Sequence, residues 1–200
     1  MTGKRILALN GSYRRDGITD QAVDCVLAEA ADRGADVEHI HLRDYPIEFC
    51  RNCRECMQHP GEAPGQCVLH DGMAYLVDKI EQADAYVLAA PTNYSAVTAV
   101  FKRFMERLSV YGYWPWGVAS PVLRKAQMRK KPAVIISSCA APGFLGKLAF
   151  GTNQSLKVAA RTMGGKVVGA MFTGLAAQER QQDVPRSVRR KAATLAQKLC

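Results

Sequence analysis

The chain has 200 residues, which suits one domain with its own hydrophobic core. Apolar residues make up 48% and charged residues 22%, which argues against a disordered or fibrous protein. No stretch approaches the roughly 18 apolar residues of a membrane span, and a net charge of +9 favours partners that carry phosphate.

Short apolar runs alternate with segments of helical periodicity along the whole chain. Such runs are typical of strands covered on both faces, and the alternation predicts a parallel sheet with helices on both sides. Ligands of such sheets bind beyond the carboxyl ends of the strands. In chain order, the expected elements are a strand over 5–10, a helix over 22–31, a strand over 37–42, a helix over 73–82, a strand over 86–90, a helix over 96–110, a strand over 133–137, a helix over 145–163, a strand over 167–172 and a helix over 184–199.

The loop after the first strand, residues 11–20, leads directly into a helix. A helix N-terminus offers unpaired amides and partial positive charge, both of which favour phosphate. The loop lacks the Walker and G-x-G-x-x-G sequences, and a plain helix start capped by Thr19 or Asp20 is the alternative. The residues that could contact a phosphate are Ser12, Arg14, Arg15, Gly17 and Thr19.

A second loop, residues 91–95, follows the third strand, and a helix with the sequence KRFMER comes after it. Together the two loops resemble the NAD(P)H-dependent FMN reductase branch of the flavodoxin-like superfamily. Three positions, Ile18, Asn93 and Glu106, depart from the family pattern. The matching positions are Gly11, Ser12, Arg14, Gly17 and Thr19 in the first motif, and Pro91, Tyr94, Ser95, Lys102, Phe104 and Arg107 in the second.

The resemblance implies a flavodoxin-like three-layer α/β sandwich, with a five-stranded parallel sheet in the order 2-1-3-4-5. It also implies an enzyme that binds FMN, takes electrons from NAD(P)H and reduces a quinone, a flavin or another small acceptor. No catalytic acid or base is expected, because the flavin carries the chemistry. A homodimer or homotetramer is expected. The cofactor-binding residues would be Ser12, Arg14, Gly17, Ile18, Thr19, Pro91, Thr92, Asn93, Tyr94, Ser95, Ser138 and Cys139.

An insertion at 46–72 interrupts the single domain of residues 1–200. It contains the spacing Cys50-x2-Cys53-x2-Cys56-x10-Cys67, which is similar to the iron–sulfur flavoproteins. Four close cysteines can hold a [4Fe–4S] cluster; reduced thiols near the flavin and a zinc site are the alternatives. With a cluster, the protein would be an electron carrier, and a non-enzymatic redox sensor is a further alternative.

The N-terminal residues resemble no secretion signal, since their apolar run covers only 6–9. We therefore expect a cytoplasmic protein, whose seven cysteines stay reduced. Residues 101–131 hold eight Lys or Arg against one Glu. We interpret this basic run as a solvated face first, an attraction for NADPH second and a nucleic-acid site last, because no nucleic-acid-binding motif accompanies it. No membrane partner is expected.

Overall fold

The computed structural model describes residues 3–142, 151–176, 178–179 and 181–200. Its centre is a parallel sheet with the strand order β2-β1-β3-β7-β8. This order confirms the expected flavodoxin-like architecture, in which a crossover places the first strand between the second and the third. The strands are β1 (Arg5–Asn10), β2 (Asp36–His41), β3 (Ala85–Asn93), β7 (Lys131–Ser138) and β8 (Gly165–Thr173).

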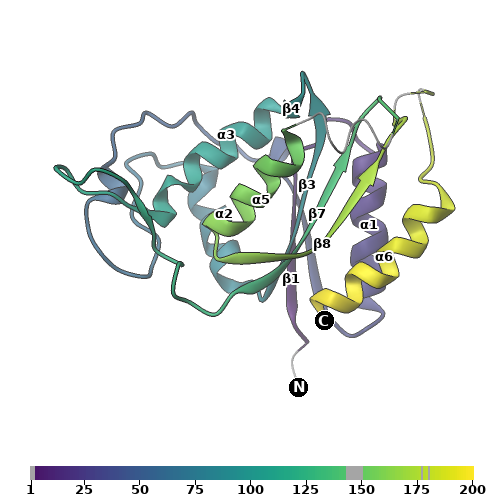
Figure 1. Ribbon diagram of the computed structural model, residues 1–200, viewed down its shortest axis with the longest axis horizontal. Helices are drawn as coiled ribbons and strands as arrows, with labels where there is room; N and C mark the ends of the chain where they lie inside the picture. Colours follow the sequence, from purple (N-terminus) through teal and green to yellow (C-terminus); the bar gives the residue numbers. More distant parts are fainter. Residues whose placement is uncertain (1–2, 143–150, 177, 180) are drawn as a thin grey trace.

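Helices cover both faces of the sheet (Figure 1). On one face lie α1 (Ile18–Ala31) and α6 (Arg186–Leu199); on the other lie α2 (Gly72–Gln82), α3 (Ala99–Arg107) and α5 (Thr152–Thr162). Alternate strand residues feed the two cores, because successive side chains of a strand point to opposite faces. In β1, Leu7 and Leu9 pack with α2 and α3, whereas Ile6 and Ala8 pack with α1 and α6.

One predicted helix differs from the structure at its start. The segment predicted as a helix over 96–110 begins with a short strand, β4 (Ala96–Val97), which pairs antiparallel with β3. Thr98 then accepts the amide of Phe101 as an N-cap, so that α3 starts at Ala99. The helix predicted over 145–163 falls partly on residues 143–150, which lie outside the described residues.

The carboxyl ends of the strands meet at one edge of the sheet, and the cysteine-rich segment lies at one end of the molecule (Figure 1). Three short 3-10 helices occur at Leu42–Asp44, Glu55–Met57 and Leu108–Tyr111. A small hairpin, β5 (Gly112–Tyr113) with β6 (Val122–Leu123), was not predicted. In the part of the chain that the structure describes, no helix is long and apolar enough to cross a bilayer.

Candidate functional site

A cavity of about 520 Å³ opens at the carboxyl edge of the sheet. It is formed by the loops that follow β1, β3 and β7, as the topology requires of a ligand site in this class of fold. Its volume is in the range of small-molecule and cofactor sites. Ten of the twelve predicted cofactor-binding residues line it: Ser12, Arg14, Gly17, Ile18, Thr19, Pro91, Thr92, Asn93, Ser138 and Cys139.

One end of the cavity is the N-terminus of α1. Gly17 is the N-cap residue, and no side chain caps the helix, so the predicted alternative of a cap at Thr19 or Asp20 is wrong. The amides of the first turn are therefore left for a ligand, and the helix dipole favours an anion there. Ser12 and Arg14 stand at the same end. Arg15 is not among the lining residues and instead pairs with Asp44 at the surface.

Hydrogen bonds between the loops hold the cavity in shape. The hydroxyl groups of Thr19 and Ser138 are 2.8 Å apart, which joins α1 to the end of β7. Thr98 donates to the carbonyl oxygen of Gly11 at 2.6 Å, which joins the start of α3 to the first loop. Gly11 is required at this contact, because a Cβ there would lie 2.7 Å from the Cβ of Phe101.

Tyr94 and Ser95 are the two predicted residues that do not line the cavity. They form the turn between β3 and β4, and both have positive φ angles, 46° and 65°. Such a turn suits the twist of a hairpin but is strained for residues other than Gly, Asn or Asp. The side chain of Tyr94 is fully exposed. In this arrangement it does not form a wall of the cavity.

Strained backbone is concentrated at two places in the described part of the chain. Non-glycine residues with positive φ cost free energy and gather at functional sites. Four of them, Asp16, Tyr94, Ser95 and Leu175, lie in or next to the loops around the cavity. The other two are Asn52 and Arg54, which flank Cys53.

The four cysteines of the insertion, Cys50, Cys53, Cys56 and Cys67, line one hollow. Burial, together with the nearby thiols of the other three, raises the pKa of Cys56 to about 11. The cavity volume of the hollow is about 20 Å³, which is room for one water molecule. Among the described residues, no group of three His, Cys, Asp or Glu side chains is arranged to hold a single metal ion. As the side chains stand, the four thiols are not arranged as a metal-binding site.

A buried ion pair holds the insertion against α3. The guanidinium of Arg107 contacts the carboxylate of Asp71 at 2.5 and 3.1 Å. It also donates to the carbonyl oxygen of Glu48 and lies 3.5 Å from the sulfur of Cys67. Arg107 therefore joins both ends of the cysteine segment. Lys102, the other cation of the motif, pairs at the surface with Glu106.

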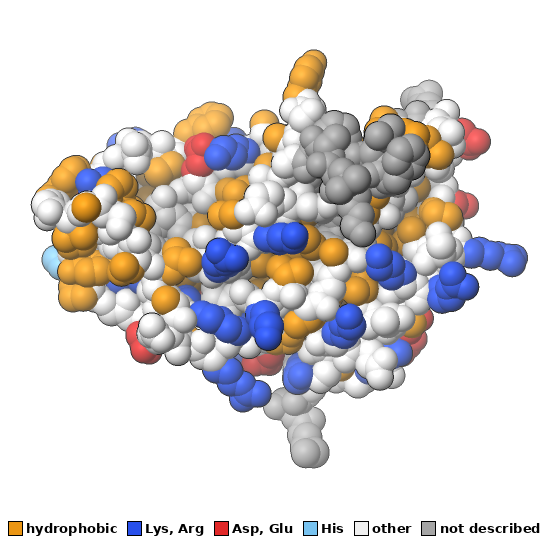
Figure 2. Space-filling view, viewed as in Figure 1, with side chains coloured by type: hydrophobic (Ala, Val, Ile, Leu, Met, Phe, Trp, Pro, Cys, Tyr) orange, Lys and Arg blue, Asp and Glu red, His pale blue; other side chains and the backbone are white. Residues whose placement is uncertain are grey.

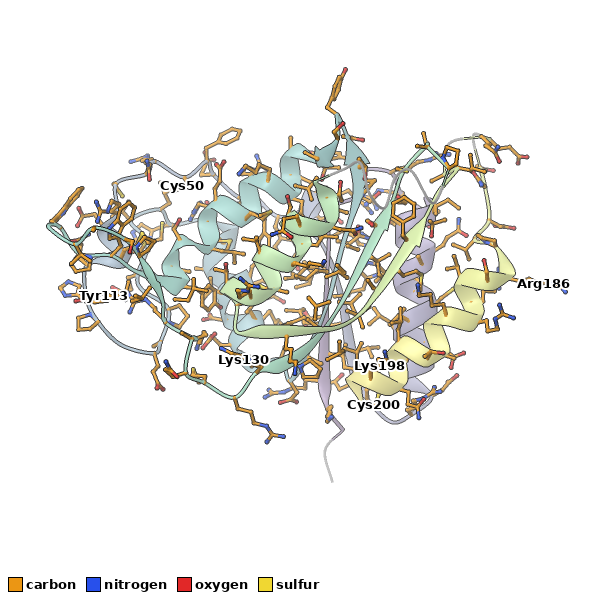
Figure 3. The ribbon with its side chains drawn as sticks, viewed as in Figure 1. Cys50, Tyr113, Lys130, Arg186, Lys198 and Cys200 are labelled. Atoms are coloured by element: carbon orange, nitrogen blue, oxygen red, sulfur yellow. The ribbon has the colours of Figure 1, made fainter. Side chains whose placement is uncertain are left out.

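Arg124 holds the loop of ten residues between Cys56 and Cys67 by hydrogen bonds to backbone carbonyl oxygens. Its guanidinium is buried and donates to the carbonyl oxygens of Val110, Gly112, Gly61, Cys56 and His59, at 2.8 to 3.1 Å. The loop thus folds around the side chain of the residue that directly follows β6. In Figure 3 the segments that carry Cys50 and Tyr113 lie at the same end of the molecule.

The basic run of residues 101–131 is only partly a solvated face. Arg124 and Lys125 are 8% and 7% exposed, and Lys125 pairs with Glu81. The prediction of a solvated face is therefore wrong for these two residues and for Arg107, which is 2% exposed. Other Lys and Arg side chains are spread in a band across the face that carries α5 and β8 (Figure 2).

Six residues that line the cavity were not predicted from the sequence. Thr98 carried a usable signal, because a threonine before an apolar helix is a common N-cap. The others are an exposed tyrosine and four small or aliphatic residues, which have no pattern of their own. The missed residues are Tyr13, Thr98, Ala99, Val100, Ala140 and Ala176.

Comparison with known proteins gives two kinds of relative. An iron–sulfur flavoprotein of Archaeoglobus fulgidus is 34% identical over 111 residues, which are 56% of this chain and 48% of that protein. YwqN of Bacillus subtilis, named as an NAD(P)H-dependent FMN-containing oxidoreductase, is 30% identical over 135 residues, 66% of this chain and 65% of that protein. The chain spans about half the length of the iron–sulfur flavoproteins that it matches.

The fold is shared with solved structures of low sequence identity. An NAD(P)H:quinone oxidoreductase from Methanothermobacter marburgensis superposes with a TM-score of 0.67 at 16% identity, over 97% of this chain and 95% of that one. The sequence profile of the NADPH-dependent FMN reductases matches residues 4–180. The chain therefore belongs to the NADPH-dependent FMN reductase family.

Proposed function

We propose that this protein binds FMN in the cavity at the carboxyl edge of the sheet and oxidises NAD(P)H to reduce a quinone, a flavin or another small acceptor. The observation that carries the proposal is the uncapped N-terminus of α1, placed at one end of a cofactor-sized cavity. A phosphate fits there because the amides of the first helical turn have no side-chain partner. The family membership supports the same ligand.

The residues that line the cavity would form two groups, one that contacts the phosphate of FMN and one that contacts its ring. Ser12, Arg14, Thr19 and the backbone of Gly17 and Ile18 would bind the phosphate. The backbone of 91–93, with Ser138 and Cys139, would hold the edge of the ring, which needs hydrogen-bonding groups beside apolar surface. When bound, FMN supplies the hydride and electron chemistry. No side chain of the cavity is assigned a proton transfer.

Anaerobic stopped-flow mixing of the FMN-loaded protein with NADPH, and separately with NADH, tests the activity. Rapid loss of the oxidised-flavin absorbance supports the proposal, and no loss with either nucleotide contradicts it. Arg14→Ala should weaken FMN binding by about tenfold, the usual size for one charge-assisted contact. Arg15→Ala is the matched control, because that side chain is 74% exposed and does not line the cavity.

An electron carrier with a [4Fe–4S] cluster is the second candidate function. One observation favours it: the four cysteines of the insertion line the same hollow. Relatives named as iron–sulfur flavoproteins add weight. The hollow, as its side chains stand, is smaller than such a cluster. Iron and sulfide analysis of anaerobically purified protein decides between the candidates, with Cys50→Ser compared against Cys25→Ser, which lies outside the insertion.

We also propose a cytoplasmic homo-oligomer, a dimer or a tetramer. All seven cysteines are free thiols, which suits a reducing compartment. Light scattering at several protein concentrations tests the oligomeric state. A mass that stays at one chain throughout would contradict it.

A further inference from the structure

Three buried polar side chains form hydrogen bonds with the loop of residues 11–17. Asn10 and Asp20 are 0% and 3% exposed, and the side chain of Arg43 is 7% exposed. Arg43 comes from the 3-10 turn after β2, so it reaches the loop from another part of the chain. None of the three lines the cavity.

These side chains form three hydrogen bonds with the backbone of the loop, and a fourth hydrogen bond joins two of them to each other. The oxygen of the Asn10 amide accepts the Ser12 amide at 2.9 Å. Arg43 donates to the Ser12 carbonyl oxygen at 2.7 Å. The carboxylate of Asp20 accepts the Asp16 amide at 3.1 Å and the Asn10 side-chain amide at 2.8 Å. The orientation of the loop therefore depends on a network of side chains that do not line the cavity.

The charges of the network bear directly on phosphate binding. Asp20 follows Thr19 in the first turn of α1, so its carboxylate is a buried negative charge at the end where an anion would bind. Alone it would repel a phosphate, and burial would keep solvent from screening that repulsion. Arg43 lies 3.6 Å from this carboxylate and compensates it.

Other groups around Arg43 do not replace this compensation. Asp44 is a second acidic neighbour, at 3.8 Å, and it is half exposed. Burial, with the neighbouring His39 and Arg43, lowers the pKa of His41, which disfavours a positive charge on this ring. The ring of His39 lies between Asn10 and the exposed Asp24. Arg43 is thus the permanent cation that faces Asp20.

We propose that Arg43 is a positioning residue for phosphate recognition: it neutralises Asp20 and holds the Ser12 carbonyl, so that the loop presents its amides to the phosphate of a flavin nucleotide. This inference rests on the proposed FMN binding. It also explains why an acidic residue can stand in the first turn of a helix that binds an anion.

The test compares FMN with riboflavin, which has the same ring and no phosphate, by titration of flavin fluorescence. Arg43→Met should weaken FMN binding by about 30-fold, equivalent to about 2 kcal/mol, and leave riboflavin binding within about threefold. Arg43→Lys keeps the charge and should stay within about fivefold of the wild type for FMN. Arg15→Met, a neighbouring exposed arginine, is the matched control.

The decisive variant is the double substitution Asp20→Asn with Arg43→Met. If Arg43 acts by compensating Asp20, removing both charges should restore FMN binding to within about fivefold of the wild type. A double variant as weak as Arg43→Met overturns the inference, and so does an equal loss of FMN and riboflavin binding by Arg43→Met. A wild-type protein that binds neither ligand refutes the proposed function itself, whereas FMN binding unaffected by Arg43→Met refutes only this inference.

Discussion

Replacing Arg107 by Met tests whether the cysteine segment is held by a buried charge. The side chains of Arg107 and Asp71 are 1% and 7% exposed, and Asp71 also caps α2 through the amide of Met73 at 3.0 Å. Removing the guanidinium leaves a buried carboxylate without its counter-ion, which typically costs about 3–5 kcal/mol. For a chain of this length, the midpoint of thermal unfolding should fall by roughly 6–20 °C.

Urea and thermal unfolding of the reduced protein without cofactor measure this loss. Lys102→Met is the matched control, because it removes an ion pair whose side chains are 61% and 43% exposed and should cost less than about 1 kcal/mol. Asp71→Asn combined with Arg107→Met should lose less than the sum of the single variants, since no charge is then left alone. A loss below about 1 kcal/mol for Arg107→Met would refute the reasoning.

The same pair predicts a pH dependence with a definite sign. Burial by itself raises the pKa of Asp71, but the bonds from Arg107 and from the amides of Glu48 and Met73 outweigh it and hold the pKa below its usual value. The stabilisation is therefore complete above the unfolded-state pKa of 3.8 and is lost as the pH falls through the lower folded-state value. As the pH falls through that range, the free energy of unfolding should decrease less in Arg107→Met than in the wild type.

Three further predictions concern the two candidate sites. Gly11→Ala should destabilise the protein by about 1–3 kcal/mol, because its Cβ would meet Phe101 at 2.7 Å; Gly151→Ala, with 3.6 Å to its nearest neighbour, is the control in the same unfolding assay. Among the four cysteines of the insertion, Cys56 should be alkylated last by iodoacetamide at about pH 8, because its pKa of about 11 leaves little thiolate. Peptide mapping by mass spectrometry follows this order, and a Cys56 as reactive as the exposed Cys53 would contradict it. Tyr94→Asn should stabilise the fold by about 0.5–1 kcal/mol, since Asn tolerates the positive φ of 46°; an equal gain in Tyr94→Ala would show that strain is not the cause.

The strands and the position of the cavity could be predicted because both depend on local patterns. Apolar runs such as 5–10 and 133–137 mark buried strands, and the order of strands and helices sends their carboxyl ends to one edge of the sheet. Ser12 and Thr19 could be predicted as cavity-lining residues because the loop after the first strand is continuous in sequence. The strand at Ala96–Val97 was missed, since two residues are too few for a periodicity.

By itself, the sequence determined the parallel α/β architecture, the loops that line the cavity and the cysteine spacing, because each depends on residues that are close together in the chain. Only the tertiary structure decided which buried cations hold those loops. Arg43 and Ser12 are 31 positions apart, Arg107 and Asp71 are 36 apart, and Arg124 and Gly61 are 63 apart. Residues so far apart in the sequence are brought into contact by the tertiary fold, and no local periodicity predicts which of them will meet. In the same way, the sequence places Tyr94 in a flavin-loop motif, but the strained turn directs its side chain into solvent.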